Sequence, residues 1–419
     1  MKSVKQTAEV QPKRKGYISY LVNLWVFLPA VLLFKVINEY SVNIPYVDDY
    51  PAILGFLSRY KNASFRDRIA LFWEQTNEHR TVYSKMIYLI YYKLYGDVNF
   101  IDLIIVNNLH WVAAFVMMVV FIRKMLPARW NIAAFVTAVA MFDINNYENS
   151  NAAMFGMVNY AQVFFFLLSL YFYEKENKKF LWLAVLFQAV CIFSSGAGLI
   201  ISVSLLIFNI LRRNKLNTII CLATSVIFGA LYFVNYIKPA PQGSSDWGVR
   251  IEFFLHELGA HFGYIYGVYF GVLVATALVL VLPIKKGKIP SEAQPFIAIL
   301  IFCLASLAAT AVLRSGFKML DSYSSRYFIY PHLIVSIIFI FMLARIEGKK
   351  YQWQLTIGFI LLMLYTYREN YDYGVAGFER AQYRLQYQEY YWPFPDKDTP
   401  RKIAEQACKE DIYCIQNER

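Results

Sequence analysis

Residues 81–96 read TVYSKMIYLIYYKLYG, and whether this stretch crosses the membrane decides the topology of everything after it. A helix over the roughly 15 residues between Arg80 and Gly96 would be about 22 Å long, which is short of a hydrocarbon layer of about 30 Å. Lys85 and Lys93 would lie about 80° apart around it, which leaves the remaining circumference to Ile, Leu and Tyr. The pattern predicts an amphipathic helix that lies in the membrane interface.

The rest of the chain is too apolar for a set of soluble domains. Of its 419 residues 58% are hydrophobic and 17% are charged, against roughly 25% charged residues in ordinary globular chains. Since a membrane helix needs about 20 mostly apolar residues, the sequence predicts an all-α polytopic membrane protein with about eleven transmembrane helices. The predicted spans lie near residues 17–38, 101–122, 131–143, 156–173, 180–194, 197–211, 217–237, 262–283, 295–313, 331–345 and 351–367.

The distribution of Lys and Arg sets the predicted orientation. These residues gather in every second loop between the predicted spans and in the N-terminal tail, residues 1–16. By the positive-inside rule those parts are cytoplasmic, and the agreement holds only if residues 81–95 are not a span. The chain is therefore predicted to be a multi-pass protein of the bacterial inner (cytoplasmic) membrane, with its N-terminus inside and its C-terminus outside.

Three parts follow from this orientation. A basic cytoplasmic tail, residues 1–16, precedes a transmembrane domain, residues 17–367, whose extracytoplasmic loop covers residues 39–100. Residues 368–419 form a small extracytoplasmic segment, too short for a robust core of its own and predicted to pack on the outer face. Within it, Cys408 and Cys414 are able to pair in an oxidising compartment, and the sequence leaves open whether they do.

Two classes of ligand are not indicated. The net charge of +12 lies in short loops, and no nucleic-acid-binding module is recognisable, so no nucleic acid partner is expected. His256 and His261 lie five residues apart, which is not the i, i+4 spacing of a helical metal pair. The sequence therefore assigns no metal ligand and no cofactor, and it leaves a role for a divalent metal ion open.

The first candidate site is the acid pair Asp48 and Asp49, shortly after the first predicted span. A carboxyl group against apolar surface has a raised pKa, and a neighbouring carboxylate raises it further, which suits a general base. The alternative is structural, because Asp ahead of Tyr50 and Pro51 is typical of a helix N-cap followed by Pro in the first turn. Both interpretations can hold for different members of the pair.

Charged residues at other predicted outside loops form the second candidate set. Arg80 suits phosphate because its planar guanidinium binds in a bidentate way, with His79 as a second donor and Glu78 beside them. The alternative is a cap on the interfacial helix, with Glu78 in a local pair. Glu148 would line the same ligand cavity as these residues, or it would be an ordinary solvated acid in a loop.

Positive charge also occurs on the predicted outer side of the membrane, where the positive-inside rule does not favour it. Arg314, Lys318 and Arg326 lie at the predicted outer ends of the ninth and tenth spans. An anionic ligand or contact with lipid headgroups would explain them. We favour ligand binding by Arg326, and we include its neighbour Tyr327 in the candidate set.

This layout resembles the GT-C membrane glycosyltransferases. A first span, an acidic pair in a long outside loop and a tyrosine-containing apolar helix that closes on a Gly (residues 82–96) resemble that family. Residues 73–80, 147–149, 195–199 and 325–327 are similar to a bacterial branch of the group.

The resemblance covers roughly residues 17–367 and implies a reaction. The reaction would move a sugar from a polyprenyl-phosphate carrier to a glycan, lipid or protein acceptor on the outer face. The resemblance assigns the general base to Asp48 or Asp49. Phosphate binding by Arg80 and Arg326 follows instead from the need to stabilise the charge of the leaving phosphate. Residues 77–80 stand where the family often has a His-Pro-Pro-like stretch, which leaves the acceptor class open.

Two alternatives belong to other classes of protein. A transporter or flippase of lipid-linked glycans would place charges near the middle of the membrane, whereas here they lie mostly at outer loop ends, which favours the enzyme. A non-catalytic subunit of an envelope assembly would use residues 368–419 for docking.

Overall fold

The computed structural model describes residues 23–175, 177–238, 243–263, 267–282, 289–316, 324–387 and 398–414, and every regular element in these ranges is a helix. The N-terminal tail, the beginning of the first predicted span and Lys318 lie outside the described residues. The helices are α2 (Leu28–Tyr40), α3 (Phe56–Asn62), α4 (Phe65–Trp73), α5 (Val82–Tyr95), α6 (Phe100–Met125), α7 (Trp130–Met141), α8 (Tyr147–Asn151), α9 (Ala153–Glu174), α10 (Lys178–Ile192), α11 (Ala197–Leu211), α12 (Lys215–Tyr232), α13 (Trp247–Gly259), α14 (Gly267–Val281), α15 (Gln294–Arg314), α17 (Ile329–Arg345), α18 (Lys349–Tyr387) and α19 (Asp398–Lys409). Short 3-10 or π turns are η1 (Leu24–Phe27), η2 (Tyr50–Gly55), η3 (Ile144–Asn146), η4 (Ala260–Phe262), η5 (Ser291–Ala293) and η6 (Ser325–Tyr327).

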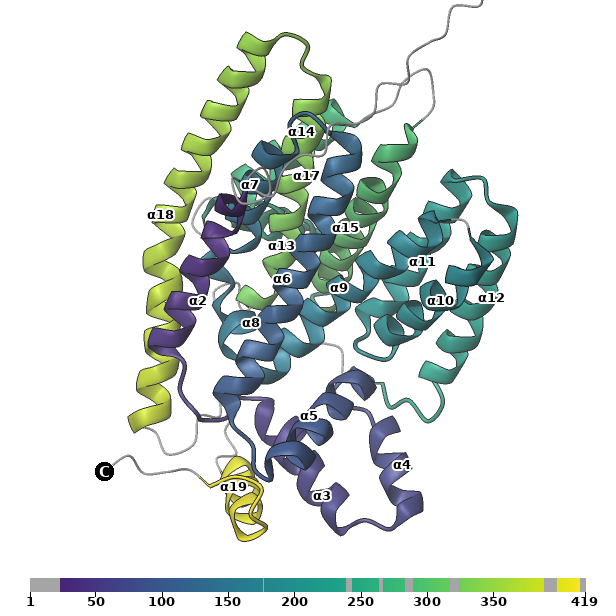
Figure 1. The fold of residues 1–419 in the computed structure, drawn as a ribbon. Coiled ribbons are helices and arrows are strands. Elements are labelled where there is room, and N and C mark those ends of the chain that lie inside the picture. The colour runs from purple at the N-terminus through teal and green to yellow at the C-terminus, as the bar shows by residue number, and fades with distance from the viewer. Residues whose placement is uncertain are drawn as a thin grey trace, which may run out of the picture.

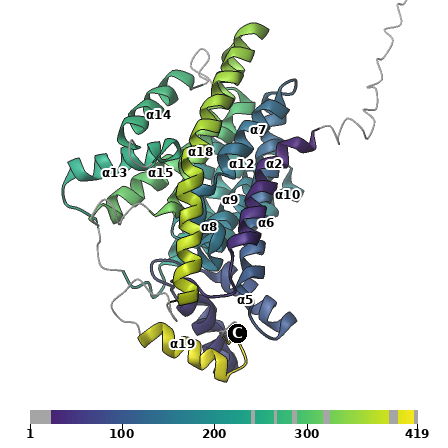
Figure 2. The ribbon, with the colours of Figure 1, turned by 90° about the vertical axis from the view of Figure 1, so that its left-hand side faces the viewer.

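The long helices form one bundle around α6, α9 and α17 (Figure 1). Helices α2 and α18 flank it on one side and α10, α11 and α12 on the other, while α13 and α14 project from the bundle in the second view (Figure 2). The loop helices α3, α4 and α5 lie together with α19 beyond one end of the bundle. The core combines aliphatic and aromatic side chains, and within it Trp111 of α6 stacks on Tyr160 of α9 with ring centroids 4.6 Å apart.

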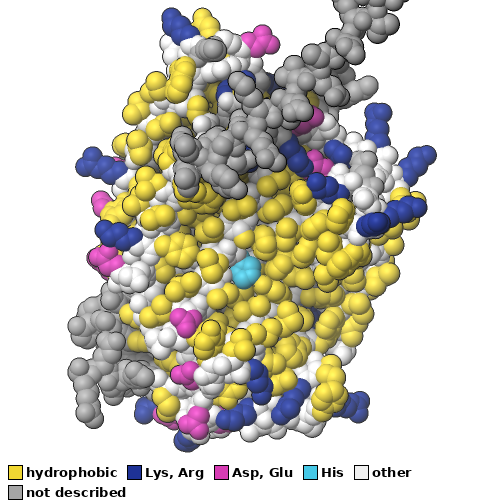
Figure 3. Space-filling model, viewed as in Figure 1, with side chains coloured by type: hydrophobic (Ala, Val, Ile, Leu, Met, Phe, Trp, Pro, Cys, Tyr) yellow, Lys and Arg dark blue, Asp and Glu magenta, His cyan; other side chains and the backbone are white. Residues whose placement is uncertain are grey.

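Among the described residues, five helices are long and apolar enough to cross a membrane, or six if α13 and α14 are one bent span. The five are Phe100–Met125, Ala153–Glu174, Lys215–Tyr232, Ser291–Arg314 and Ser325–Arg345. On the face shown in Figure 3, hydrophobic side chains cover a broad middle region, and many of the charged side chains lie toward the two ends and along the edges. The predicted class, an all-α polytopic membrane protein, is confirmed. The predicted number of eleven spans is not confirmed.

The stretch that decided the predicted topology is helical, as expected. Helix α5 ends at Gly96, which caps it in the left-handed conformation at φ 89°. A residue with a side chain adopts that conformation only with strain, so Gly closes the helix at this point. Met86, Ile90 and Leu94 are exposed along one face of α5. This pattern suits contact with lipid, and the position of α5 in the interface stays a prediction.

Two helices differ from the expected boundaries. Helix α13 lies within residues 238–261, which were expected to be a loop; Asp246 caps it by accepting a hydrogen bond from the Gly248 amide at 2.7 Å. Its polar first turns carry no continuous apolar run, which is why the pattern did not mark it. Helix α18 continues to Tyr387, beyond the predicted end of the last span at residue 367, because no Pro or Gly pair interrupts it there.

The C-terminal segment folds back on the first long loop. The Ile412 carbonyl accepts a hydrogen bond from the Val98 amide at 2.8 Å, and the Tyr413 hydroxyl donates to the Asn43 carbonyl at 2.8 Å. Cys408 and Cys414 form a disulfide that closes the end of α19. The segment therefore lies on the same face of the protein as the acid pair.

Candidate functional site

The two acids of the pair have different surroundings. Asp49 is 1% exposed, and its carboxylate accepts hydrogen bonds from the Tyr46 amide at 2.9 Å and the Met154 amide at 2.7 Å. Met154 lies in the first turn of α9, so Asp49 satisfies a free amide at the beginning of that helix. Burial raises the pKa of Asp49 to about 7. This residue is a structural cap, although of a distant helix rather than of its own.

Asp48 faces the other charged residues. It is partly buried, and its carboxylate accepts one hydrogen bond, from the Asn77 side-chain amide at 3.3 Å. Burial raises the pKa of Asp48, while the positive charge of Arg326 opposes the rise. Val47, the preceding residue, has a positive φ of 45°, and this sharp turn sends the two adjacent acids to different environments.

A tight turn over residues 76–79 presents the next members of the site. Thr76 and His79 exchange backbone hydrogen bonds of 2.8 and 2.9 Å, and Asn77 has a φ of 48°, a conformation that Asn tolerates. The Gly196 amide donates to Nδ1 of His79 at 3.1 Å. The neutral ring therefore carries its proton on Nε2, which lies 3.6 Å from the Glu78 carboxylate.

The charges around this turn are mutually compensating. Glu78 forms an ion pair with Arg314. Burial alone would raise the pKa of Glu78, but His79 and Arg314 beside it lower the pKa below its ordinary value. Burial lowers the pKa of His79, so the ring is held mainly neutral.

Glu148 and Arg326 form the opposite side of the site. One Glu148 carboxylate oxygen accepts from the Arg326 amide at 3.2 Å and from the hydroxyls of Ser324 and Ser325. In return the Ser325 hydroxyl accepts from the Glu148 amide at 3.0 Å. Glu148 is therefore no solvated loop acid, because it holds the turn that carries Arg326.

The Arg326 guanidinium packs against aromatic rings, while Glu148, Asp48 and Glu78 act on it only through their charge. It lies 4.6 Å from the ring centroid of Phe155 and 5.5 Å from that of Tyr327. Within the described part of the chain the guanidinium forms no hydrogen bond or ion pair, and its Nε is buried without a partner. A cation in this state suits an anionic ligand.

Arg80 lies apart from these residues. It is 2% exposed, and its guanidinium donates to the backbone carbonyls of Tyr232, at 3.0 Å, Trp73 and Val234. All three donor nitrogens are engaged in joining the first loop to the end of α12. This environment favours a structural role for Arg80 over the predicted phosphate binding, which stays an untested prediction.

The structure thus brings Asp48, Glu78, His79, Glu148 and Arg326 into one electrostatic group, with Tyr327 against Arg326. It adds Arg314 and Asn77, which the candidate set omitted. The sequence had already marked Arg314 by its unfavoured positive charge on the predicted outer side, but ligand binding was assigned to Arg326 instead. Nothing local marks Asn77, because only the fold brings it to Asp48.

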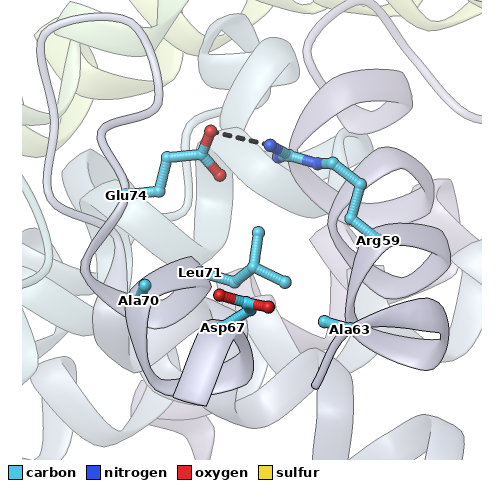
Figure 4. Close-up of a pocket in the computed structure, with 6 residues that line it drawn as sticks. All are labelled: Arg59, Ala63, Asp67, Ala70, Leu71 and Glu74. Carbon is cyan, nitrogen blue, oxygen red and sulfur yellow. Dashed lines mark hydrogen bonds and ion pairs between the residues drawn. The ribbon is translucent and has the colours of Figure 1, made fainter. Parts of the chain in front are cut away.

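Two further observations limit the chemistry. Among the described residues no group of three or more His, Cys, Asp or Glu side chains is placed to hold a metal ion. A cavity between α3 and α4, lined by Ala63, Asp67, Ala70, Leu71 and the ion pair of Arg59 with Glu74 at 2.7 Å, includes none of the site residues (Figure 4). That cavity is therefore separate from the candidate site.

No family model and no curated protein matches the chain. It is similar to solved structures of ArnT from Cupriavidus metallidurans, in the apo state (14% identity, 81% of this chain and 63% of that one, TM-score 0.49) and bound to undecaprenyl phosphate (14%, 83% and 64%, 0.49). It is also similar to the archaeal oligosaccharyltransferase AglB from Archaeoglobus fulgidus in complex with an inhibitory peptide and a dolichol-phosphate (13%, 94% and 60%, 0.47). This chain spans less than two thirds of the length of each.

Proposed function

We propose that this chain is a membrane glycosyltransferase of the GT-C type. It would move a sugar from a polyprenyl-phosphate carrier to a glycan, lipid or protein acceptor in the cell envelope. The observation that carries the proposal is the electrostatic interaction of Asp48, a carboxyl group with a pKa raised by burial, with Arg326, a guanidinium that forms no hydrogen bond or ion pair among the described residues.

The two groups suit the two ends of the reaction. Arg326 would bind the phosphate of the carrier and stabilise the charge that it gains on leaving. Asp48 would accept the proton of the acceptor hydroxyl as its oxygen forms a bond to the sugar. The bond between the sugar and the phosphate oxygen then breaks with its electron pair on the phosphate, which inverts the sugar carbon. No metal ion enters this scheme.

The remaining site residues would place these two groups. Glu148 holds the turn that carries Arg326, and Glu78 holds Arg314, a second positive charge near the phosphate. Asn77 orients the Asp48 carboxylate. Asp49 and Arg80 are left out of the chemistry, because their polar atoms are engaged with backbone groups.

The compartment is part of the proposal. Residues 39–100 and the C-terminal segment lie on one face, and that segment contains a disulfide, which persists in oxidising compartments. This supports an extracytoplasmic site on a bacterial inner membrane, with the N-terminus inside.

One observation favours the transporter alternative. Helices α13 and α14 meet at 86°, and His261 beside the bend shares a hydrogen bond of 2.7 Å with His332 of α17. Broken helices with buried polar groups are typical of transport sites. Movement of a lipid-linked glycan across the membrane of proteoliposomes, without transfer of its sugar to an acceptor, would support the transporter function.

The test compares Asp48→Asn with Asp67→Asn, a control in helix α4, in cells and in proteoliposomes. The proposal expects the first variant to reach the membrane in normal amount and to lose at least about 100-fold in transfer rate, as general-base catalysis contributes. The control should keep full activity. Full activity in Asp48→Asn would contradict the assignment of the base.

A further inference from the structure

Glu257, near the end of α13, is a buried acid that the proposed reaction does not use. Its side chain is 0% exposed, and neither carboxyl oxygen has a hydrogen-bond partner among the described residues. Buried polar side chains in folded proteins nearly always have partners, because an unpaired one forfeits its bonds to water. An acid in this state requires an explanation.

Glu257 interacts electrostatically with one member of the candidate site. Glu148 is its electrostatic neighbour, and Glu148 also accepts the hydrogen bond from the Arg326 amide. The Nε of Arg326 is likewise buried and without a partner in the described part of the chain. Two sets of polar atoms without partners among the described residues are therefore both linked to Glu148: the carboxyl oxygens of Glu257 through their charge, and the Nε of Arg326 through the turn that Glu148 holds.

The complement of these atoms is a molecule with hydroxyl groups and an anionic group. Hydroxyls donate to carboxyl oxygens and also accept from a protonated carboxyl, so they satisfy Glu257 in either protonation state. An anionic oxygen satisfies the guanidinium of Arg326. A sugar phosphate combines both, whereas a bare lipid phosphate supplies only the second.

We propose that Glu257 binds hydroxyl groups of the sugar that the lipid carrier brings, while Arg326 binds the phosphate. This rests on the proposed function and extends it, because it assigns recognition of the sugar to a residue outside the catalytic group. Specificity follows from the same contact. A buried carboxyl group that lacks its hydroxyl partner stays unsatisfied, so a donor sugar without a hydroxyl at that place is bound more weakly.

A purely structural role would have different consequences. A structural acid stabilises the fold, so its replacement lowers the Tm of the ligand-free protein. An acid kept for a ligand has the opposite effect, because an apolar side chain removes an unsatisfied group. Glu257→Leu should therefore raise the Tm of the ligand-free protein by about 2 °C, and Glu257→Gln should leave the Tm near that of the parent protein.

The probes are undecaprenyl phosphate alone and undecaprenyl phosphate that carries glucose, mannose or arabinose, each added to the full chain in nanodiscs. Thermal shifts report binding, because a ligand of the folded state raises the Tm. Glu252, exposed on the same helix, supplies the matched control Glu252→Gln.

The parent protein and Glu252→Gln should be stabilised by the bare carrier and further by at least one sugar-bearing form. Glu257→Leu should keep the first shift and lose the second, with affinity for the sugar-bearing form about tenfold weaker. Retention of the second shift in Glu257→Leu overturns the inference. So does the absence of any added shift from sugar in the parent protein, or a lower Tm in both Glu257 variants. If no probe shifts the parent protein, the proposed donor class itself fails.

Discussion

Replacing Asp49 by Asn should destabilise the protein without touching the proposed chemistry. The Asp49 carboxylate accepts from the amides of Tyr46 and Met154, at 2.9 and 2.7 Å. Asn has nearly the same shape as Asp but only one acceptor oxygen. One of the two backbone amides would therefore lose its acceptor and would face the side-chain NH₂ group of Asn instead. That substitution should lower the free energy of unfolding by about 2 kcal/mol.

The pH dependence provides a second signature with a defined sign. The pKa of Asp49 is about 7 in the folded protein against 3.8 as its ordinary value. The folded state binds the proton of Asp49 more tightly than the unfolded state does. The contribution of Asp49 to the free energy of unfolding is therefore greatest at low pH. Between pH 3.8 and about 7 it falls as pH rises, by at most about 1.4 kcal/mol per pH unit. Asn does not titrate, so the Tm values of parent and variant should converge between pH 5 and pH 8.

The assay is thermal unfolding of the detergent-solubilised protein across this pH range, with Asp48→Asn as the matched control. Among the described residues the Asp48 side chain accepts a single hydrogen bond, of 3.3 Å, and Asp48 is partly buried, so its replacement should change stability by no more than about 0.5 kcal/mol. Equal destabilisation by both variants, or a pH-independent gap between parent and Asp49→Asn, would refute the separation of roles drawn above.

Three other substitutions test neighbouring parts of the structure. Arg80→Met leaves three carbonyls without their cation and should lower the free energy of unfolding by about 3 kcal/mol, measured as Tm; an unchanged Tm would contradict the structural role. Arg326→Ala should leave the Tm nearly unchanged but weaken binding of undecaprenyl phosphate about tenfold or more, measured by titration; unchanged affinity would remove it from the phosphate site. Cys408→Ser opens the small loop closed with Cys414 and should destabilise the C-terminal segment by about 2 kcal/mol, seen as faster proteolysis there while the bundle stays protected.

Much of the fold could be predicted because its determinants are local. Lengths of apolar runs and the placement of basic loops indicate a polytopic helical membrane protein, and helices occur at every predicted span. Gly96 marks the end of α5 by a requirement of the backbone itself. Where local signals are weak, prediction failed: α13 has a polar beginning, and α18 shows no boundary where the apolar composition ends.

The roles of individual charged residues could not be predicted in the same way. Asp48 and Asp49 are adjacent and chemically identical in the sequence, and only an amide 105 residues further along the chain separates the cap from the candidate base. Arg80 and Arg326 looked alike as phosphate ligands until the fold supplied carbonyls from residues more than 150 positions away to one of them.

The sequence by itself therefore determined that this chain forms membrane helices, and where in the chain its scarce charges lie. Tertiary structure alone decided which charged side chains have partners within the described part of the chain and which, like those of Arg326 and Glu257, have polar atoms without one there. The physical reason is that helix formation depends on neighbours three or four positions apart, whereas desolvation and hydrogen bonding of a charge depend on whatever distant segments pack against it.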